Sequence, residues 1–154
     1  MKPVPVFISA LLAAAFLSAP ARAGDDWADA PQTPGDWSYR SEAARSMAGF
    51  GPPETEYQLM LLCERGSNQI TLLVAGEAAS PVLTTVRTET QQRTLTLNQS
   101  AMEMPYLSAT FAADDRLLDA MAITRGRFAV EVAGLEPLYL PAWAEVTRVI
   151  EDCR

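Results

Sequence analysis

Few residues of this sequence could do chemistry. Asp114, Asp115 and Asp119 form its densest group of carboxylates, and a helix would place Asp115 and Asp119 one turn apart. Two such carboxylates could bind Ca²⁺ or act as an acid and a base. The glycine and the alternating ligands of a calcium loop are missing, however, and helix capping accounts for Asp114 and Asp115. We therefore predict no metal site and no cofactor.

A second candidate is the basic spot Arg125-Gly126-Arg127 in an otherwise acidic chain. Two arginines could hold a phosphate or a carboxylate through paired hydrogen bonds. They also follow a predicted helix, whose negative dipole end would attract them without any ligand. The sequence leaves both interpretations open.

The residues that the chain lacks exclude most enzyme classes. It has no histidine, and Lys2 is its only lysine. The commonest general base and metal ligand is therefore absent, and no Schiff-base amine remains once the first residues are removed. We find neither a Gly-x-Ser-x-Gly turn nor a phosphate-binding glycine loop. We predict that the protein is not an enzyme; the alternative is a small enzyme that uses the carboxylates of Asp114, Asp119, Glu131 or Glu136.

Residues 1–23 have the pattern of an export signal. Lys2 gives a basic start, residues 6–17 are apolar, and Ala21-Arg22-Ala23 is a small-residue cleavage site. The apolar run is shorter than the roughly 20 residues of a membrane span. We expect a mature chain of residues 24–154 in the periplasm or outside the cell, without a transmembrane segment. An N-terminal anchor that is never cleaved is the alternative.

The charge of the chain bears on its partners. The net charge is −7, and loss of Lys2 and Arg22 with the signal would bring it to −9. An acidic surface disfavours nucleic acid and anionic lipid. It favours a basic partner, or it simply keeps the protein soluble.

The chain has two cysteines, Cys63 and Cys153, which lie ninety positions apart. Two cysteines in an oxidising compartment usually form one disulfide. A reactive thiol at Cys63 would need a cationic neighbour to lower its pKa, and only Arg65 is near in sequence. We predict a Cys63–Cys153 disulfide.

Hydrophobic alternation predicts that strands carry most of these residues. We expect a flexible acidic leader over residues 24–35, which includes Trp27, and one domain over residues 36–154. Residues 43–47 would continue the first strand or form a short helical turn. The expected strands are residues 37–40, 57–63, 70–74, 82–88, 93–97, 107–111, 128–132 and 138–140.

Two helices complete the prediction. One begins at Asp114 or Asp115 and ends before Gly126. The other covers residues 141–152 and would place Trp143, Val146, Ile150 and Cys153 on one buried stripe. The predicted fold is a mainly β (α+β) domain, either an antiparallel β-sandwich or a partly open barrel, with about seven or eight strands. The C-terminal helix would pack on the sheet.

The order of these features resembles that of small Gram-negative periplasmic proteins. The features are the signal, Gly35-Asp36-Trp37, an apolar strand ending at Cys63, Leu117-Leu118, and Val149-Ile150-x-x-Cys153. They resemble the invasion-associated locus B family and the VasI-type accessory proteins of type VI secretion. The resemblance implies a compact β-rich envelope domain with a closing helix and a stabilising disulfide. The further cysteines usual in the first family are absent, neither family supplies a catalytic residue, and an uncharacterised family of the same build is the alternative.

We therefore expect an exported, non-catalytic binding or accessory protein of the cell envelope. Its partner would be a protein or another envelope component, basic if the net charge guides the encounter. The alternative is an inhibitor of a secreted hydrolase, which would present residues 64–68 or 98–105 as a rigid loop.

Overall fold

The computed structural model describes residues 26–154. The predicted signal, residues 1–23, and the first two residues of the leader lie outside the described part. The elements in chain order are η1 (Asp26–Ala28), β1 (Asp36–Ser41), β2 (Arg45–Gly51), β3 (Leu59–Glu64), β4 (Gln69–Ala75), β5 (Val82–Arg87), β6 (Gln92–Gln99), β7 (Tyr106–Ala112), α1 (Arg116–Ile123), β8 (Arg127–Val132), β9 (Leu138–Pro141) and α2 (Ala144–Glu151).

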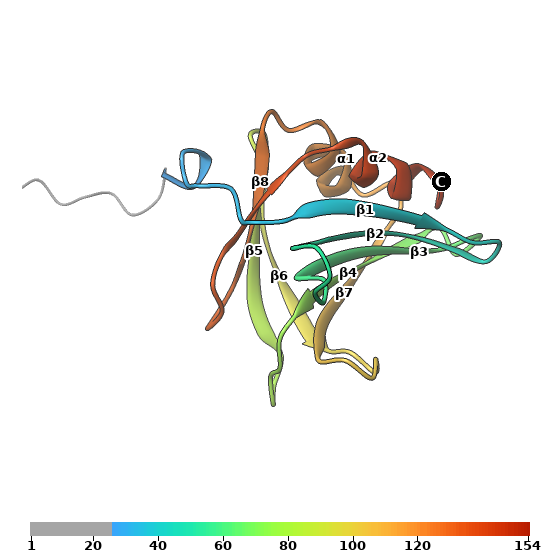
Figure 1. Cartoon of the computed structure of the whole chain (residues 1–154), viewed down its shortest axis with the longest axis horizontal. Coiled ribbons are helices and arrows are strands. Elements are labelled where there is room, and N and C mark those ends of the chain that lie inside the picture. The colour runs from blue at the N-terminus through green and yellow to red at the C-terminus, as the bar shows by residue number, and fades with distance from the viewer. Residues whose placement is uncertain (1–25) are drawn as a thin grey trace, which may run out of the picture.

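The nine strands form one antiparallel sheet in the order β1-β2-β3-β4-β7-β6-β5-β8-β9. The sheet curls into a half-barrel, and α1 and α2 lie on its concave side (Figure 1). The predicted mainly β class, with the C-terminal helix on the sheet, is confirmed. Strands β6 and β7 pair only through Asn98–Ser108 and Gln99–Leu107, so the sheet splits there and its two halves diverge.

The strand that the sequence did not resolve is β2. It pairs with β1 on one side and β3 on the other, and it raises the number of strands from the predicted seven or eight to nine. Gly49 and Gly51 favoured a break because glycine weakens a strand. Gly49 instead allows a close approach, since a Cβ there would lie 2.8 Å from ring carbons of Tyr57.

The two edges of the sheet meet at one end. The N–H of Thr33, just before β1, donates to the carbonyl oxygen of Tyr139 on β9 at 3.0 Å. The N–H of Tyr139 donates in turn to Oγ1 of Thr33 at 2.8 Å. Trp37 on β1 donates from Nε1 to the carbonyl oxygen of Pro141 at 2.7 Å. The last part of the predicted leader thus covers the outer edge of β9, which would otherwise be open to other chains.

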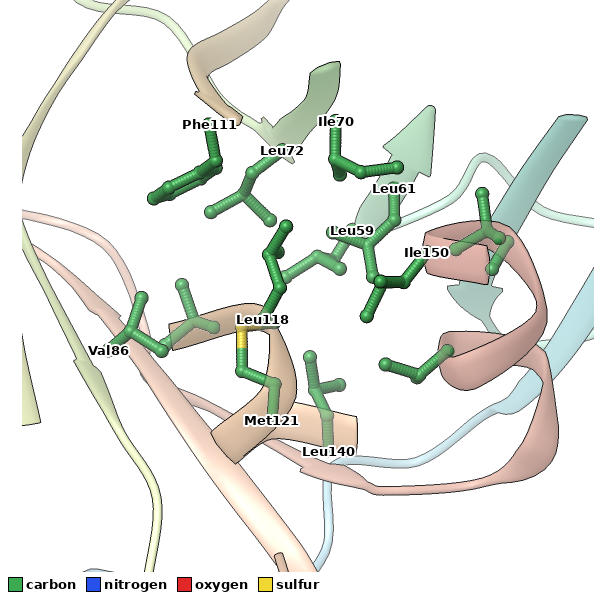
Figure 2. Packing of buried hydrophobic residues seen from close by; sticks show 14 of the residues in the cluster. Leu59, Leu61, Ile70, Leu72, Val86, Phe111, Leu118, Met121, Leu140 and Ile150 are labelled. Carbon is green, nitrogen blue, oxygen red and sulfur yellow. The ribbon is translucent and has the colours of Figure 1, made fainter. Parts of the chain in front are cut away.

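The core lies between the concave side of the sheet and the two helices. Figure 2 shows Leu118 and Met121 of α1 and Ile150 of α2 among side chains of the strands. The indole of Trp37 packs edge-on against Phe50, with ring centroids 5.3 Å apart. The largest fully buried side chains are Phe50, Phe128, Leu59, Leu61, Ile70, Leu72, Leu97, Leu107, Leu117, Leu118, Met121 and Leu140.

The closing helix is shorter than the sequence predicted. Val146, Ile150 and Cys153 are buried, as expected from their spacing. Trp143, however, is the N-cap residue of α2 and its side chain is 42% exposed, so its assignment to the buried stripe was wrong. Pro141, expected in the first helical turn, is the last residue of β9 and pairs with Arg127.

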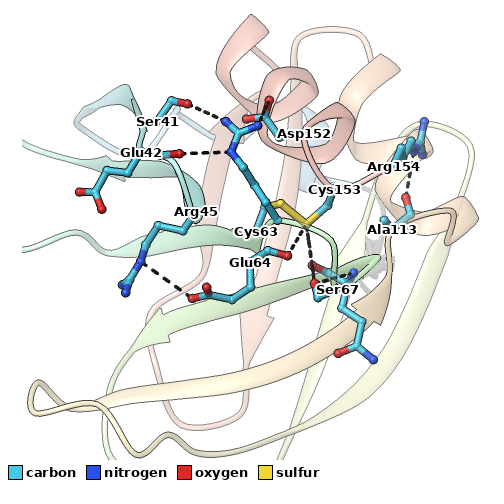
Figure 3. The surroundings of a disulfide bond; sticks show 12 residues. Ser41, Glu42, Arg45, Cys63, Glu64, Ser67, Ala113, Asp152, Cys153 and Arg154 are labelled. Atoms are coloured by element: carbon cyan, nitrogen blue, oxygen red, sulfur yellow. Dashed lines mark hydrogen bonds and ion pairs between the residues drawn. A yellow bond between two sulfur atoms is a disulfide. The ribbon is translucent and has the colours of Figure 1, made fainter.

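The predicted disulfide joins the end of α2 to β3. Cys63 and Cys153 are bonded with their Cα atoms 5.7 Å apart, and both side chains are buried. Beside the bond (Figure 3), Arg65 donates to Oγ of Ser41 at 2.6 Å and to the carbonyl oxygen of Glu42 at 3.2 Å. The same guanidinium lies 3.6 Å from the carboxylate of Asp152. The β1–β2 turn, β3 and the end of α2 are therefore held together.

Candidate functional site

The carboxylates of α1 have structural partners. Asp115 is the N-cap residue and accepts a hydrogen bond from the N–H of Leu117 at 2.8 Å. Nη2 of Arg93 lies 2.9 Å from each carboxylate oxygen of Asp115. Partial burial alone would raise the pKa of Asp115, but the hydrogen bonds from Arg93 and Leu117 and the charge of Arg93 outweigh it and lower that pKa. Asp119 forms an ion pair with Arg154.

The other carboxylates considered for catalysis lie apart. Asp114 precedes α1, and Glu136 lies in the turn between β8 and β9. Glu131 on β8 forms an ion pair with Arg87 on β5 at 3.0 Å. Asp114 lines a hollow beside Arg154, and none of Asp119, Glu131 and Glu136 lines that hollow. Within residues 26–154, no group of three or more histidine, cysteine, aspartate or glutamate side chains could hold a metal ion.

Arg125 and Arg127 do share a hollow, and Trp27 lies in it too. We name it the arginine hollow; it measures about 280 Å³ and is lined by Trp27, Ala28, Glu89, Arg125, Gly126 and Arg127. Its walls are the leader, the β5–β6 turn with Glu89, and the α1–β8 turn, which lies almost a hundred residues from the leader in sequence. The two arginines were singled out in the sequence and Trp27 was placed in the leader, but no local pattern showed that they would meet.

A second hollow lies on the convex side of the sheet. We name it the methionine hollow; it measures about 180 Å³ and is lined by Arg40, Glu42, Arg45, Met47, Met60, Leu62, Leu73 and Met102. Two of these lining residues, Met60 and Leu73, form with Tyr106 a small buried cluster separate from the core. The apolar residues at positions 60 and 62, between the core residues of β3, were its signal in the sequence.

Aromatic residues and a loop support the methionine hollow. The Tyr57 hydroxyl lies 2.7 Å from Oγ of Ser38, so its ring crosses β2 above Gly49. The Tyr106 hydroxyl donates to the carbonyl oxygen of Tyr57 at 2.8 Å. Burial, and to a lesser degree the nearby Glu56 and Tyr57, raise the pKa of Tyr106, which keeps this donor protonated.

The loop between β6 and β7 carries Met102 to the hollow. The N–H of Ser100 donates to the carbonyl oxygen of Tyr106 at 2.8 Å, and the N–H of Gly76 donates to that of Pro105 at 2.9 Å. The base of the loop is therefore fixed. Its tip presents Met102 and Met104 with 47% and 41% of their surfaces exposed.

The rim of the methionine hollow carries both signs of charge. Arg45 lies 4.0 Å from Glu64, and both side chains are more than half exposed, so this ion pair is weak. Arg40 forms no ion pair within the described part of the chain. An apolar floor with a charged rim is suited to holding an apolar side chain.

Comparisons with protein-family models, with curated proteins and with solved structures give no match for this chain. Among residues 26–154, no helix has the length and apolar character needed to cross a membrane.

Proposed function

We propose that the protein is an exported, non-catalytic binding protein of the cell envelope, and that it holds an apolar segment of a partner protein in the methionine hollow. The observation that carries the proposal is the apolar, methionine-lined hollow on the convex side of the sheet. The outer face of an antiparallel sheet is usually polar. Apolar side chains gathered there, beside exposed methionines, favour a contact surface.

The composition of the hollow suits a protein partner. Methionine side chains are flexible and polarisable, so they adapt to apolar groups of different shape. A hollow of about 180 Å³ has the volume of roughly six water molecules, which suits one apolar side chain. Burying that side chain and the exposed part of Met102 would remove apolar surface from water and stabilise the complex.

The charge of the protein suits a basic partner. The predicted mature chain has nineteen acidic residues against ten arginines. Such an excess raises the association rate of a basic protein at low salt. In this proposal the net charge attracts the partner and the methionine hollow holds it.

Photo-cross-linking in the exporting cell tests the proposal. A photoreactive residue at position 102 should link the protein to a specific partner, whereas the same residue at position 83 should not. Leu83 is the matched control because it is also apolar and exposed, at 62%, but lies on β5 away from the hollow. Equal cross-linking from both positions would contradict the proposed surface.

Methyl NMR of the purified pair then locates the contact. The partner should shift the methyl signals of Met47, Met60 and Met102 and leave that of Met121 unchanged, because Met121 is buried on the inner side of α1. Met102→Gln should weaken binding about tenfold, as expected for loss of a buried apolar contact, and Leu83→Gln should not. Shifts confined to other parts of the protein would refute the role of the hollow.

An inhibitor of a secreted hydrolase is the second candidate. The observation that favours it is the β6–β7 loop, which the sequence analysis put forward, with its base fixed and two methionines exposed at its tip. If the cross-linked partner is a hydrolase, the protein should abolish its activity in equimolar mixture, and Met102→Gln should restore that activity.

A further inference from the structure

We propose that the arginine hollow is a second binding site, independent of the methionine hollow, for an anionic sugar, that is, a sugar ring bearing a carboxylate or a phosphate. The site has three parts: two arginines, one indole and one carboxylate. Each part matches one feature of such a ligand.

The two arginines lie on a turn that is fixed from several sides. The N–H of Arg127 donates to the carbonyl oxygen of Arg125 at 3.0 Å, and the N–H of Ala142 donates to that of Gly126 at 3.2 Å. Gly126 has φ +76°, which a side chain would disfavour. Thr124, which is buried, accepts a hydrogen bond from the N–H of Glu89 at 2.9 Å. A fixed turn lowers the ordering cost of binding.

Arg125 and Arg127 have no ion-pair partner among residues 26–154, although the chain has nineteen acidic residues. By contrast, Arg93 and Arg154 are paired with carboxylates. Two unpaired guanidinium groups on one tight turn can bind a carboxylate or phosphate with charge-assisted hydrogen bonds.

Trp27 and Glu89 define the rest of the ligand. The half-buried indole of Trp27 lines the hollow and offers a flat apolar surface to a ring. Glu89 lines the same hollow, and its ionised carboxylate can only accept hydrogen bonds. A plain anion gains nothing from the indole and is repelled by Glu89. A sugar acid or sugar phosphate has a ring for Trp27, hydroxyl donors for Glu89 and an anion for the arginines.

The experiment uses the processed, exported protein and glucuronic acid as the probe. Acetate, which has only the carboxylate, and glucose, which has only the sugar ring, are the control ligands. Glucuronate should shift the indole N–H signal of Trp27 in NMR spectra, with a Kd at or below about 10 mM. The indoles of Trp37, buried in the core, and Trp143, on α2, are internal controls that should not move. Acetate and glucose should each bind at least roughly tenfold more weakly.

Single substitutions distinguish binding in this hollow from a general attraction of the anion to positive charge. Arg125→Gln and Arg127→Gln should each weaken glucuronate binding roughly tenfold. Arg116→Gln removes the same charge at the far end of α1, from an exposed residue outside the hollow, and should have little effect. Glu89→Gln should lower the preference for glucuronate over acetate roughly fivefold, because acetate loses a repulsion and glucuronate loses a hydrogen-bond acceptor.

Three results would overturn the proposal: no shift of the Trp27 signal up to about 10 mM glucuronate, equal binding of acetate and glucuronate, or equal weakening by Arg116→Gln and Arg125→Gln. Glucose 1-phosphate in place of glucuronate shows whether the site prefers phosphate or carboxylate. None of these results depends on a protein partner, so they leave the proposal for the methionine hollow unaffected.

Discussion

Breaking the Cys63–Cys153 bond should cost about 4.5 kcal/mol of unfolding free energy. The bond closes a loop whose ends are 90 residues apart, and the chain-entropy relation for a loop of that length gives this value. A domain of this size has a stability of about 5 to 15 kcal/mol. The reduced protein should therefore remain folded only if the unfolding free energy of the oxidised protein lies well above the lower end of that range. With an m-value of about 2 kcal/mol/M, the urea midpoint should fall by about 2 M.

Urea unfolding of the oxidised protein, the reduced protein and the Cys63→Ala/Cys153→Ala variant measures this effect. The reduced protein is the matched control, since it keeps both sulfur atoms in the core and lacks only the bond. The m-value should rise on reduction because the unfolded chain, freed of its cross-link, exposes more surface. A loss below about 1 kcal/mol with an unchanged m-value would refute the argument that the bond acts by restricting the unfolded chain.

Three further predictions concern single contacts. Gly49→Ala should destabilise the protein by about 1 to 3 kcal/mol in urea, because the new methyl group would force the Tyr57 ring off β2; an unchanged midpoint would contradict that packing. Trp37→Phe should cost about 1 kcal/mol in the same assay, since it removes a buried hydrogen bond to the carbonyl oxygen of Pro141, which keeps only the N–H of Trp143 as a donor. A loss no larger than that of an ordinary surface substitution would show that this bond is unimportant. Asp115→Asn should keep the helix cap but lose the charge that Arg93 binds. Because the folded-state pKa of Asp115 is lowered, its charge stabilises the fold above the unfolded pKa of about 3.9 and this contribution is lost as the pH falls through the folded value. The variant should therefore melt below the wild type at neutral pH and together with it in strong acid, and a difference that persists in strong acid would rule out the charge as its cause.

The sequence was most informative where one face of an element decides burial. Alternation along β3 placed Cys63 inward, and helical spacing did the same for Cys153, so the disulfide could be predicted from residue patterns alone. The N-cap role of Asp115 was equally local, because a short acceptor before an apolar helix caps it.

The errors of the sequence analysis concern the ends of strands and helices, which the local residue pattern does not determine. Pro141 suits the first turn of a helix as well as the end of a strand. Its place in β9 follows from pairing with Arg127 on a distant strand, and that pairing leaves Trp143 at the exposed start of α2. The glycines of β2 likewise suggested a break, and only the ring of Tyr57 above Gly49 explains why the strand continues.

The two candidate sites show the same division. The apolar outer residue Met60 was visible in the alternation of β3, but the loop that brings Met102 beside it was not. The Arg125–Arg127 turn was singled out, but its meeting with Trp27 was not predicted; the leader that carries Trp27 is held to β9 by the pairing of Thr33 with Tyr139. Contacts between such distant segments have no local signal in a single sequence.

The closure of the two sheet edges also determines when the fold can form. During synthesis β1 can pair with β2 early, but the groups that close this end of the sheet arrive much later: Trp37 bonds to a residue 104 positions on, and Tyr39 to one 113 positions on. A nascent chain cannot complete this end of the sheet until β9 and α2 have left the ribosome. Contacts this distant slow folding and leave the incomplete chain unstructured at both edges. Such late closure is compatible with the proposed export, because a chain that has not yet folded can be threaded through a narrow secretion channel.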